Sequence, residues 1–145
     1  MIAIGADHGG FELKEYIKKH LDEIGVEYKD YGTYSEASID YPDCAAPVCK
    51  AVQDGASEKG ILICGTGIGI SMAANKYKGI RAALCGDVFS AKMSKQHNNA
   101  NILCMGGRVT GRELAFMILD TWLETEFEGG RHEARIAKIH QAEGL

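Results

Sequence analysis

Residues 60–71 read Gly60-Ile61-Leu62-Ile63-Cys64-Gly65-Thr66-Gly67-Ile68-Gly69-Ile70-Ser71. The stretch begins as a short apolar run, passes through a turn with three glycines and continues with the spacing of a helix. A strand that leads through a tight turn into a helix is the repeating unit of parallel α/β sheets, so residues 60–64 are predicted to form a buried parallel strand. Similar apolar runs occur at Met1–Ala6, Val26–Tyr31, Ile80–Cys85 and Asn101–Met105.

Segments with helical periodicity lie between these runs. In the first segment Leu13, Ile17, Leu21 and Ile24 recur at helical spacing, and Gly25 ends the pattern. The alternation predicts a single three-layer α/β/α, Rossmann-like domain with five parallel strands over residues 1–145. Further helices are expected over Pro42–Val52, Ile68–Asn75, Asp87–Gln96 with Asp87 as N-cap, Gly111–Leu123, and from about Arg131 onward.

Composition excludes several classes of protein. The chain has 16 Lys+Arg and 20 Asp+Glu, for a net charge of −4 and no run of one sign, which argues against an electrostatic nucleic-acid binder. No stretch approaches the roughly 18 apolar residues of a membrane helix, and the N-terminus lacks a signal-peptide pattern, so we expect a cytoplasmic protein. The five cysteines form no CxxC pair, which argues against a disulfide framework or a zinc site.

The glycine-rich turn at residues 65–69 predicts an anion site. Ligands of parallel sheets bind at the carboxyl ends of strands, where the N–H groups of this turn and the dipole of the following helix would face an anion. The spacing is neither that of a dinucleotide-binding GxGxxG motif nor that of a P-loop. The structural alternative is a turn that only allows close strand–helix packing.

Cys64 precedes this turn, where amide dipoles favour the thiolate over the thiol. A thiolate there can accept a proton or attack carbon, and Thr66 can donate a hydrogen bond to the thiolate or to a substrate oxygen. A buried structural cysteine and a helix-capping threonine are the alternatives.

Asp7 and His8 follow the first strand and precede Gly9 and Gly10. A carboxylate beside an imidazole suits acid–base chemistry, whereas in the structural alternative Asp7 caps the first helix and His8 is solvated. The other histidines share no ligand spacing with Cys or Asp, so no metal site is predicted.

Two further groups are candidates for substrate binding. Residues 96–101 read Gln-His-Asn-Asn-Ala-Asn, which fits either sugar hydroxyls or a turn rich in Asn. Arg131 and Arg135 share one helix face, and Arg108 follows the fifth strand. Such guanidinium groups fit a phosphate, although a solvated helix face with Glu133 as counter-charge is the usual reason for this pattern.

Taken together, these motifs resemble one family. Gly5–Gly10, Ile63–Gly69, His97–Asn101 and Gly106–Arg108 occur in this order, and the chain resembles, over essentially its whole length, the family that joins type B ribose-5-phosphate isomerase with allose-6-phosphate and galactose-6-phosphate isomerases. Some members have serine in place of the cysteine, and Cys64 places this chain with the cysteine type.

The resemblance implies a cofactor-independent and metal-independent isomerase of the pentose phosphate pathway. It implies interconversion of ribose 5-phosphate and ribulose 5-phosphate through a cis-enediolate, a sheet order of 2-1-3-5-4, and a homodimer or dimer of dimers whose active site is shared between subunits. The last helix, about 131–145, would then pack at the subunit interface. The implied catalytic residues are Cys64 as base, Thr66, His97 for ring opening, and Asp7. The implied substrate contacts are Asp7, His8, Tyr41, Gly65, Thr66, Gly67, Ile68, Gly69, Asn98, Arg108, Arg131 and Arg135.

Two functions from other classes compete with this one. A flavodoxin-like or nucleotide-binding module shares the architecture but gives no role to Cys64 and His97. A silent sugar-phosphate sensor needs the arginines and the turn but no base. The motifs do not distinguish a preference for five-carbon from one for six-carbon sugar phosphates.

Overall fold

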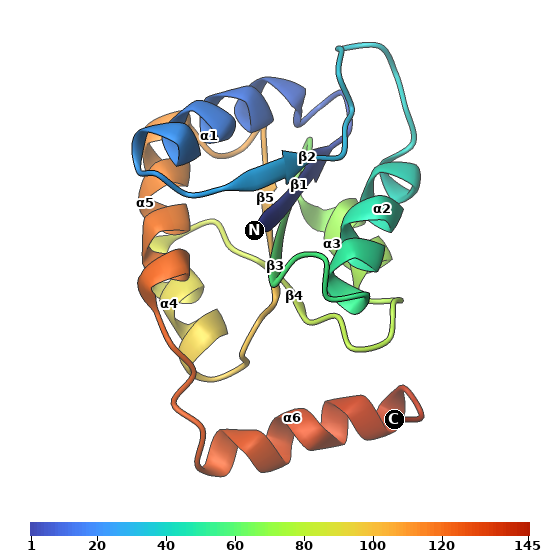
Figure 1. Ribbon diagram of the computed structural model, residues 1–145, viewed down its shortest axis with the longest axis vertical. Helices are drawn as coiled ribbons and strands as arrows, with labels where there is room; N and C mark the ends of the chain where they lie inside the picture. The colour runs from blue at the N-terminus through green and yellow to red at the C-terminus, as the bar shows by residue number, and fades with distance from the viewer.

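The computed structural model describes residues 1–145 as alternating strands and helices around one parallel sheet (Figure 1). The strands are β1 Ile2–Ala6, β2 Tyr28–Asp30, β3 Lys59–Cys64, β4 Ala82–Leu84 and β5 Ile102–Gly106. The helices are α1 Phe11–Glu23, α2 Tyr41–Gln53, α3 Ile68–Ala74, α4 Val88–Gln96, α5 Arg112–Glu124 and α6 Arg131–Ala142. The sheet order is β2-β1-β3-β5-β4, which confirms the predicted fold.

Side chains alternate between the two faces of the sheet and define its layers. Ile2, Ile4 and Ala6 of β1 pack with α1, α4 and α5, whereas Ala3 packs with α2 and α3. Figure 1 shows α1, α4 and α5 on one side of the sheet and α2 and α3 on the other. Because both faces are covered, β1 and β5 are buried along their whole length, and β3 is buried at every residue but Lys59, as is usual for parallel sheets.

The two edge strands are shorter than the sequence predicts. The apolar runs 26–31 and 80–85 form strands of only three residues, Tyr28–Asp30 and Ala82–Leu84. Each of these strands pairs on one side only, so fewer residues are held in the ladder. Ile80 and Cys85 are nevertheless buried, so their apolar character reports burial rather than strand pairing.

Local signals mark several helix ends as predicted. The Asp87 Oδ1 atom accepts a hydrogen bond from the Ser90 N–H at 2.7 Å, which confirms Asp87 as the N-cap of α4. Gly25 follows α1 with a φ of +74°, a left-handed conformation that glycine adopts without strain. None of the helices has the length and apolar character needed to span a bilayer.

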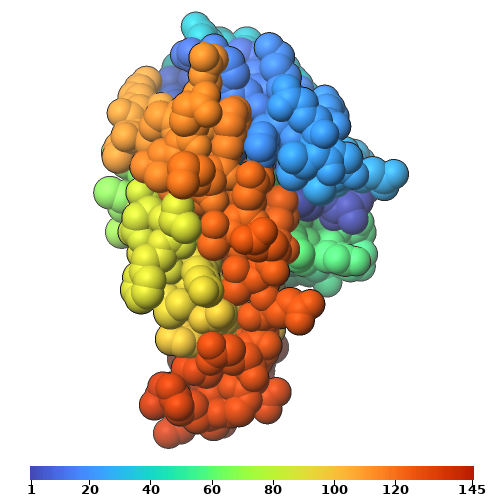
Figure 2. Space-filling view, turned by 90° about the vertical axis from the view of Figure 1, so that its left-hand side faces the viewer, coloured from blue at the N-terminus to red at the C-terminus, as the bar shows by residue number.

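Helix α6 stands apart from the three layers. Figures 1 and 2 show it projecting from one end of the molecule, beyond the sheet. His132 is its only buried residue, and the rest of the helix is exposed or half-buried. Helix α6 therefore contributes little to the core.

Candidate active site

The carboxyl ends of β1, β3 and β5 meet at one edge of the sheet. Cys64, the last residue of β3, pairs with Gly106 at the end of β5. The Asp7 N–H donates to the carbonyl oxygen of Ile63 at 3.1 Å, and the Arg108 N–H donates to that of Gly65 at 3.0 Å. These bonds bring together the three segments that the sequence marked as candidates, because adjacent parallel strands end side by side.

Cys64 lies at the centre of this edge with only 4% of its surface exposed. Its Sγ atom accepts a hydrogen bond from the Gly67 N–H at 3.1 Å. Gly67 reaches this position because its φ is +80°, where a side chain would be strained. An N–H directed at sulfur stabilises the thiolate form, so this geometry suits a base.

The other four cysteines behave as the apolar residues that the sequence predicts. All are buried and none forms a disulfide. Burial raises the pKa of Cys44 to about 11 and that of Cys49 to about 12. Burial also raises the pKa of Cys85 and of Cys104. These four groups therefore remain thiols near neutral pH.

The turn after Cys64 offers uncommitted N–H groups. The N–H groups of Gly65, Thr66 and Gly69 donate no hydrogen bond within the chain. The Thr66 Oγ1 atom accepts from the Ile68 N–H at 3.2 Å, but the N-cap of α3 is Gly67, so Thr66 is not the capping residue of the structural alternative. Tyr41 lies against Gly69, since a Cβ atom there would stand 2.7 Å from the ring. The turn can therefore bind an oxyanion beside an aromatic ring.

Asp7 and His8 form the neighbouring wall of the site. The Asp7 Oδ1 atom accepts from the N–H groups of Gly9 at 2.9 Å and Gly10 at 3.1 Å, which leaves Oδ2 uncommitted. The His8 Nδ1 atom accepts from the Ile39 N–H at 3.2 Å. That bond leaves Nε2 of His8 as the donor of the neutral ring.

A cleft of about 730 Å³ adjoins this wall and is lined by His8, Glu12 and Arg108 among others. Arg108 also flanks the turn, because its Nη1 atom lies 3.4 Å from the place where a Cβ of Gly65 would stand. The Nε2 donor of His8 and the Arg108 guanidinium can bind an anion on their side of the cleft, which Glu12 and Glu36 also line.

His97 and Asn98 lie at the other end of the sheet. His97 caps the C-terminus of α4, and residues 97–101 lead into β5, whose first residue, Ile102, pairs with Gly60 at the start of β3. Cys64 pairs with the last residue of β5, four positions further along. At about 3.3 Å per residue, the strand separates the two ends by about 13 Å.

Within residues 97–101 the asparagines have different roles. Asn99 is the only non-glycine residue with positive φ, at +46°, and the Asn101 side chain bonds to the backbone of Arg81 and Gly79. A structural role in the turn therefore accounts for Asn99 and Asn101. The Asn98 side chain makes no hydrogen bond within the chain and is free to bind a ligand.

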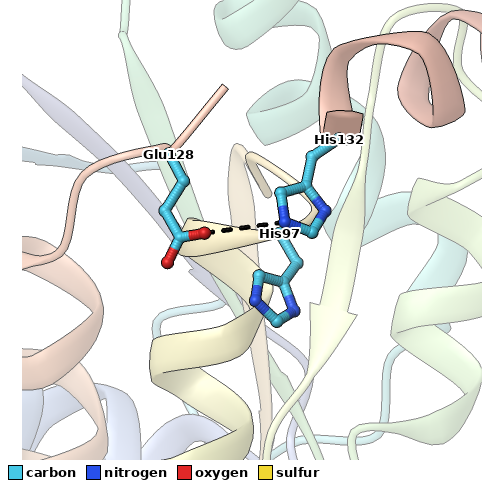
Figure 3. Close-up of side chains that lie close together, drawn as sticks. All are labelled: His97, Glu128 and His132. Atoms are coloured by element: carbon cyan, nitrogen blue, oxygen red, sulfur yellow. Dashed lines mark ion pairs between the residues drawn. The ribbon is translucent and has the colours of Figure 1, made fainter. Parts of the chain in front are cut away.

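His97 belongs to a cluster that the sequence did not reveal. Figure 3 shows the His97 ring close to the His132 ring and Glu128 directed at His132. The two imidazole rings are stacked, with centroids 4.3 Å apart. The His132 Nε2 atom lies 3.6 Å from Glu128 Oε2. Burial and the neighbouring His97 ring lower the pKa of His132, which favours its neutral form. Glu128 and His132 are four positions apart, but His97 lies 31 positions before Glu128, so no local motif joins it to them.

The donor atoms of His97, Glu128 and His132 lie within 4.8 Å of one another, and these side chains are the ones that could hold a metal ion. However, Arg131 and Arg135 are close enough for their charges to act on His132, which itself lies in the first turn of α6. A helix N-terminus and two guanidinium groups favour an anion and oppose a cation. Neither arginine forms an ion pair with Glu133 or any other carboxylate.

The predicted site residues therefore fall into two groups within one chain. We call them the thiol end, at the carboxyl ends of the strands, and the imidazole end, at the opposite edge with α6. The thiol end holds Asp7, His8, Tyr41, Cys64–Gly69 and Arg108. The imidazole end holds His97, Asn98, Arg131 and Arg135.

Comparison with known proteins finds relatives that match nearly the whole chain. A profile of the Ribose/Galactose Isomerase family matches residues 2–139. The chain is 54% identical to Ribose-5-phosphate isomerase B of Escherichia coli over 95% of this chain and 93% of that one. It is 44% identical to D-erythrulose-4-phosphate isomerase of Pectobacterium atrosepticum, over 95% and 91% of the two chains.

A solved structure agrees with these relatives. The crystal structure of Ribose-5-phosphate Isomerase B from Mycoplasma genitalium with bound ribulose-5-phosphate superposes with a TM-score of 0.94 at 43% identity, covering 99% of this chain and 95% of that one. The resemblance carried by the four motifs is thus confirmed, and the chain belongs to the Ribose/Galactose Isomerase family.

Proposed function

We propose that the protein is an aldose–ketose isomerase of the pentose phosphate pathway that interconverts D-ribose 5-phosphate and D-ribulose 5-phosphate through a cis-enediolate. The observation that carries this proposal is the thiol end, where the Cys64 sulfur accepts a hydrogen bond from the Gly67 N–H and the N–H groups of Gly65, Thr66 and Gly69 are free. The name of the Escherichia coli relative and the ligand of the Mycoplasma genitalium structure support the substrate.

The proposed proton transfer uses only groups of this chain. The Cys64 thiolate takes the proton from C2 of open-chain ribose 5-phosphate, and the electron pair of the C–H bond forms the C1–C2 double bond of the enediolate. The carbonyl oxygen on C1 becomes an oxyanion, which the N–H groups of Gly65, Thr66 and Gly69 stabilise, with the Thr66 hydroxyl as a further donor. The proton of the C2 hydroxyl then passes to the oxygen on C1, and the electron pair of the C1–C2 double bond takes the proton back from the thiol at C1. C2 is left as the carbonyl carbon of ribulose 5-phosphate. Preorganised donors are essential because a proton next to a carbonyl is otherwise too weakly acidic at pH 7.

The remaining steps require the imidazole end of a second copy. His97 passes a proton between the ring oxygen and the anomeric hydroxyl, which opens the furanose, and Asn98 holds the sugar. Arg131 and Arg135, together with His8 and Arg108, bind the phosphate. The separation of about 13 Å along β5 and the unpaired arginines of α6 support a homodimer, or a dimer of dimers, in which each thiol end faces a partner's imidazole end.

A complementation experiment tests this shared site. Cys64→Ala and His97→Asn, each nearly inactive alone, are co-expressed with different affinity tags, and the mixed dimers are purified. Each mixed dimer contains one site with both an intact thiol and an intact imidazole, so it should regain about half of the wild-type kcat/KM for ribose 5-phosphate. Activity no higher than that of the parent variants would show that His97 and Cys64 act within one chain.

The substrate and the absence of a metal requirement are tested on the wild-type protein. Ribose 5-phosphate should be turned over with a higher kcat/KM than allose 6-phosphate, and exhaustive chelation should leave the rate unchanged. The purified protein should be colourless and should not bind nucleotides, in contrast to a flavodoxin-like module. Loss of activity on chelation with recovery on adding a divalent ion would contradict the proposed mechanism.

A further inference from the structure

Arg81 connects three segments at the imidazole end of the molecule. It lies just before β4, and its Nε and Nη2 atoms donate to the carbonyl oxygen of Asn99 at 2.9 and 2.8 Å. Its Nη1 atom lies 3.0 Å from His140 Nε2 on α6 and donates to the carbonyl oxygen of Gly79 at 3.4 Å. One half-buried guanidinium therefore holds both the 97–101 loop and α6.

The contact with α6 has a defined direction. Arginine can only donate, so His140 Nε2 accepts, and His140 Nδ1 donates to Glu143 Oε2 at 3.2 Å. Glu143 Oε2 also accepts from the Gly79 N–H at 3.0 Å. Because His132 is the only buried residue of α6 and lies at the opposite end of the helix, this group fixes the C-terminal half of α6.

The contact with the loop acts next to the proposed ligand-binding residues. Asn99 has a φ of +46°, which is unfavourable for a residue with a side chain, and two N–H groups of Arg81 converge on its carbonyl oxygen. His97 and Asn98 immediately precede it. The hydrogen bonds of Arg81 therefore restrict the backbone that orients both side chains.

We propose that Arg81 is a positioning residue for the isomerase, which holds the ring-opening loop and the phosphate-binding helix in one fixed arrangement. It does so without touching the substrate. The inference rests on the roles proposed above for His97, Asn98, Arg131 and Arg135. Their side chains must meet the thiol end of another copy, so a shift of about 1 Å in the loop or the helix lowers the rate by about 10²-fold.

The test compares two substrates that differ in the need for ring opening. Ribose 5-phosphate must open a furanose, whereas D-erythrose 4-phosphate cannot close one because its O4 carries the phosphate. A four-carbon sugar phosphate is a reasonable probe, since the Pectobacterium atrosepticum relative is named for D-erythrulose 4-phosphate. Inorganic phosphate is used as a competitive inhibitor. Its inhibition constant reports on binding at the phosphate site and not on the rate of the chemical step.

Arg81→Lys keeps the positive charge but removes the planar guanidinium whose two N–H groups bind the Asn99 carbonyl oxygen. It should lower kcat/KM for ribose 5-phosphate by about 10- to 100-fold. The loss on erythrose 4-phosphate should be several-fold smaller. His140→Ala leaves the bonds to Asn99 intact, so it should weaken inhibition by phosphate while keeping the ratio between the two substrates unchanged. A second variant, Arg81→Met, removes the charge as well and should exaggerate both effects.

His20→Ala is the matched control. His20 forms a similar His–carboxylate contact, 2.7 Å to Asp120, between α1 and α5 and away from both site ends. It should lower Tm without changing the substrate ratio or the inhibition by phosphate. If folded Arg81→Lys shows equal losses on both substrates and unchanged phosphate inhibition, as expected for a purely structural residue, the inference is wrong.

His97→Asn, measured in the same panel, separates this inference from the proposed function. It should reduce activity on ribose 5-phosphate far more than activity on erythrose 4-phosphate. An unchanged substrate ratio in His97→Asn would overturn the ring-opening role itself and, with it, the role of Arg81. A changed ratio in His97→Asn but not in Arg81→Lys would overturn only the inference about Arg81.

Discussion

The two ends of the sheet are built in different ways. At the thiol end the chemistry comes from backbone N–H groups and a buried cysteine, held by pairing between central strands. At the imidazole end it comes from side chains on a loop and on an outlying helix, held by other side chains such as Arg81 and His132. We therefore expect substitutions at the thiol end to affect the chemical step or the fold. Substitutions at the imidazole end should mainly affect the capture and orientation of the substrate.

Cys64→Ala should break the thiol end with the largest effect. Removing the base should lower kcat by about 10³-fold or more and abolish exchange of the C2 hydrogen with solvent. Binding of inorganic phosphate should change little, because the proposed phosphate ligands at both ends are intact. The measurements are steady-state kinetics and the incorporation of deuterium from D₂O, followed by NMR.

Alkylation of the wild-type protein provides the control for Cys64. The raised pKa values of the other four cysteines predict slow reaction at those sites, so modification at Cys64 should inactivate the enzyme, and substrate should protect it. Cys49→Ala should retain full activity. Exchange at near wild-type rate in Cys64→Ala would move the search for the base to Asp7.

Arg135→Ala should affect the imidazole end by a smaller amount. Loss of one charge-assisted contact with phosphate, about 1.5–3 kcal/mol, predicts a fall in kcat/KM of about 10- to 100-fold, mainly through KM. Arg131→Ala should behave alike, since both side chains share one exposed helix face. An unchanged kcat/KM would remove the residue concerned from the site.

Gly67→Ala tests how strongly the fold of the thiol end depends on the glycine turn, through the free energy of unfolding. At a φ of +80° the new Cβ would be strained and would also stand 2.8 Å from the backbone carbon of Met105. Unfolding in urea should show a destabilisation of about 2–4 kcal/mol, from left-handed strain and crowding together. Gly55→Ala is the control, because Gly55 has a similar φ of +78° in open space and reports the strain alone. Equal losses in the two variants would mean that the turn tolerates the extra atom.

Lys95→Met should produce the smallest effect and tests how the imidazole end is packed. Lys95 is 6% exposed, stands over the Trp122 ring and has no carboxylate partner. Burial, with Lys59 nearby, lowers its pKa to about 8. Burying this charge destabilises the folded state, so Met should raise the stability by about 1 kcal/mol, or about 2–4 °C in Tm.

The pH dependence of this gain follows from the direction of the pKa shift. Below about pH 8 the amine is charged in both the folded and the unfolded protein, so the gain from Lys95→Met should be complete. Between about pH 8 and 10.5 only the unfolded state stays charged, so wild-type stability recovers and the gain should shrink. A gain that is constant across this range would assign it to packing instead of charge.

Much of the fold could be predicted from sequence because its signals are local. The spacing of Leu13, Ile17 and Leu21 places one helix face on the sheet, and the glycines after β3 mark the turn at Cys64. Helix bounds at Asp87 and Arg131 follow from capping and glycine signals. The lengths of the edge strands were overestimated because apolar residues such as Ile80 are buried without joining the ladder.

The sequence by itself determined the fold class, the position of the thiol end and the identity of the chemical groups, since each depends on neighbours within a few residues. Only the tertiary structure decided that His97 lies at the opposite edge of the sheet from Cys64, because that distance depends on strand direction and length. Only the fold brings His132 onto His97 and Arg81 onto Asn99. Contacts between residues 18 to 35 positions apart leave no periodic trace in the sequence, because periodicity reports which face of an element is buried and not which segment covers it.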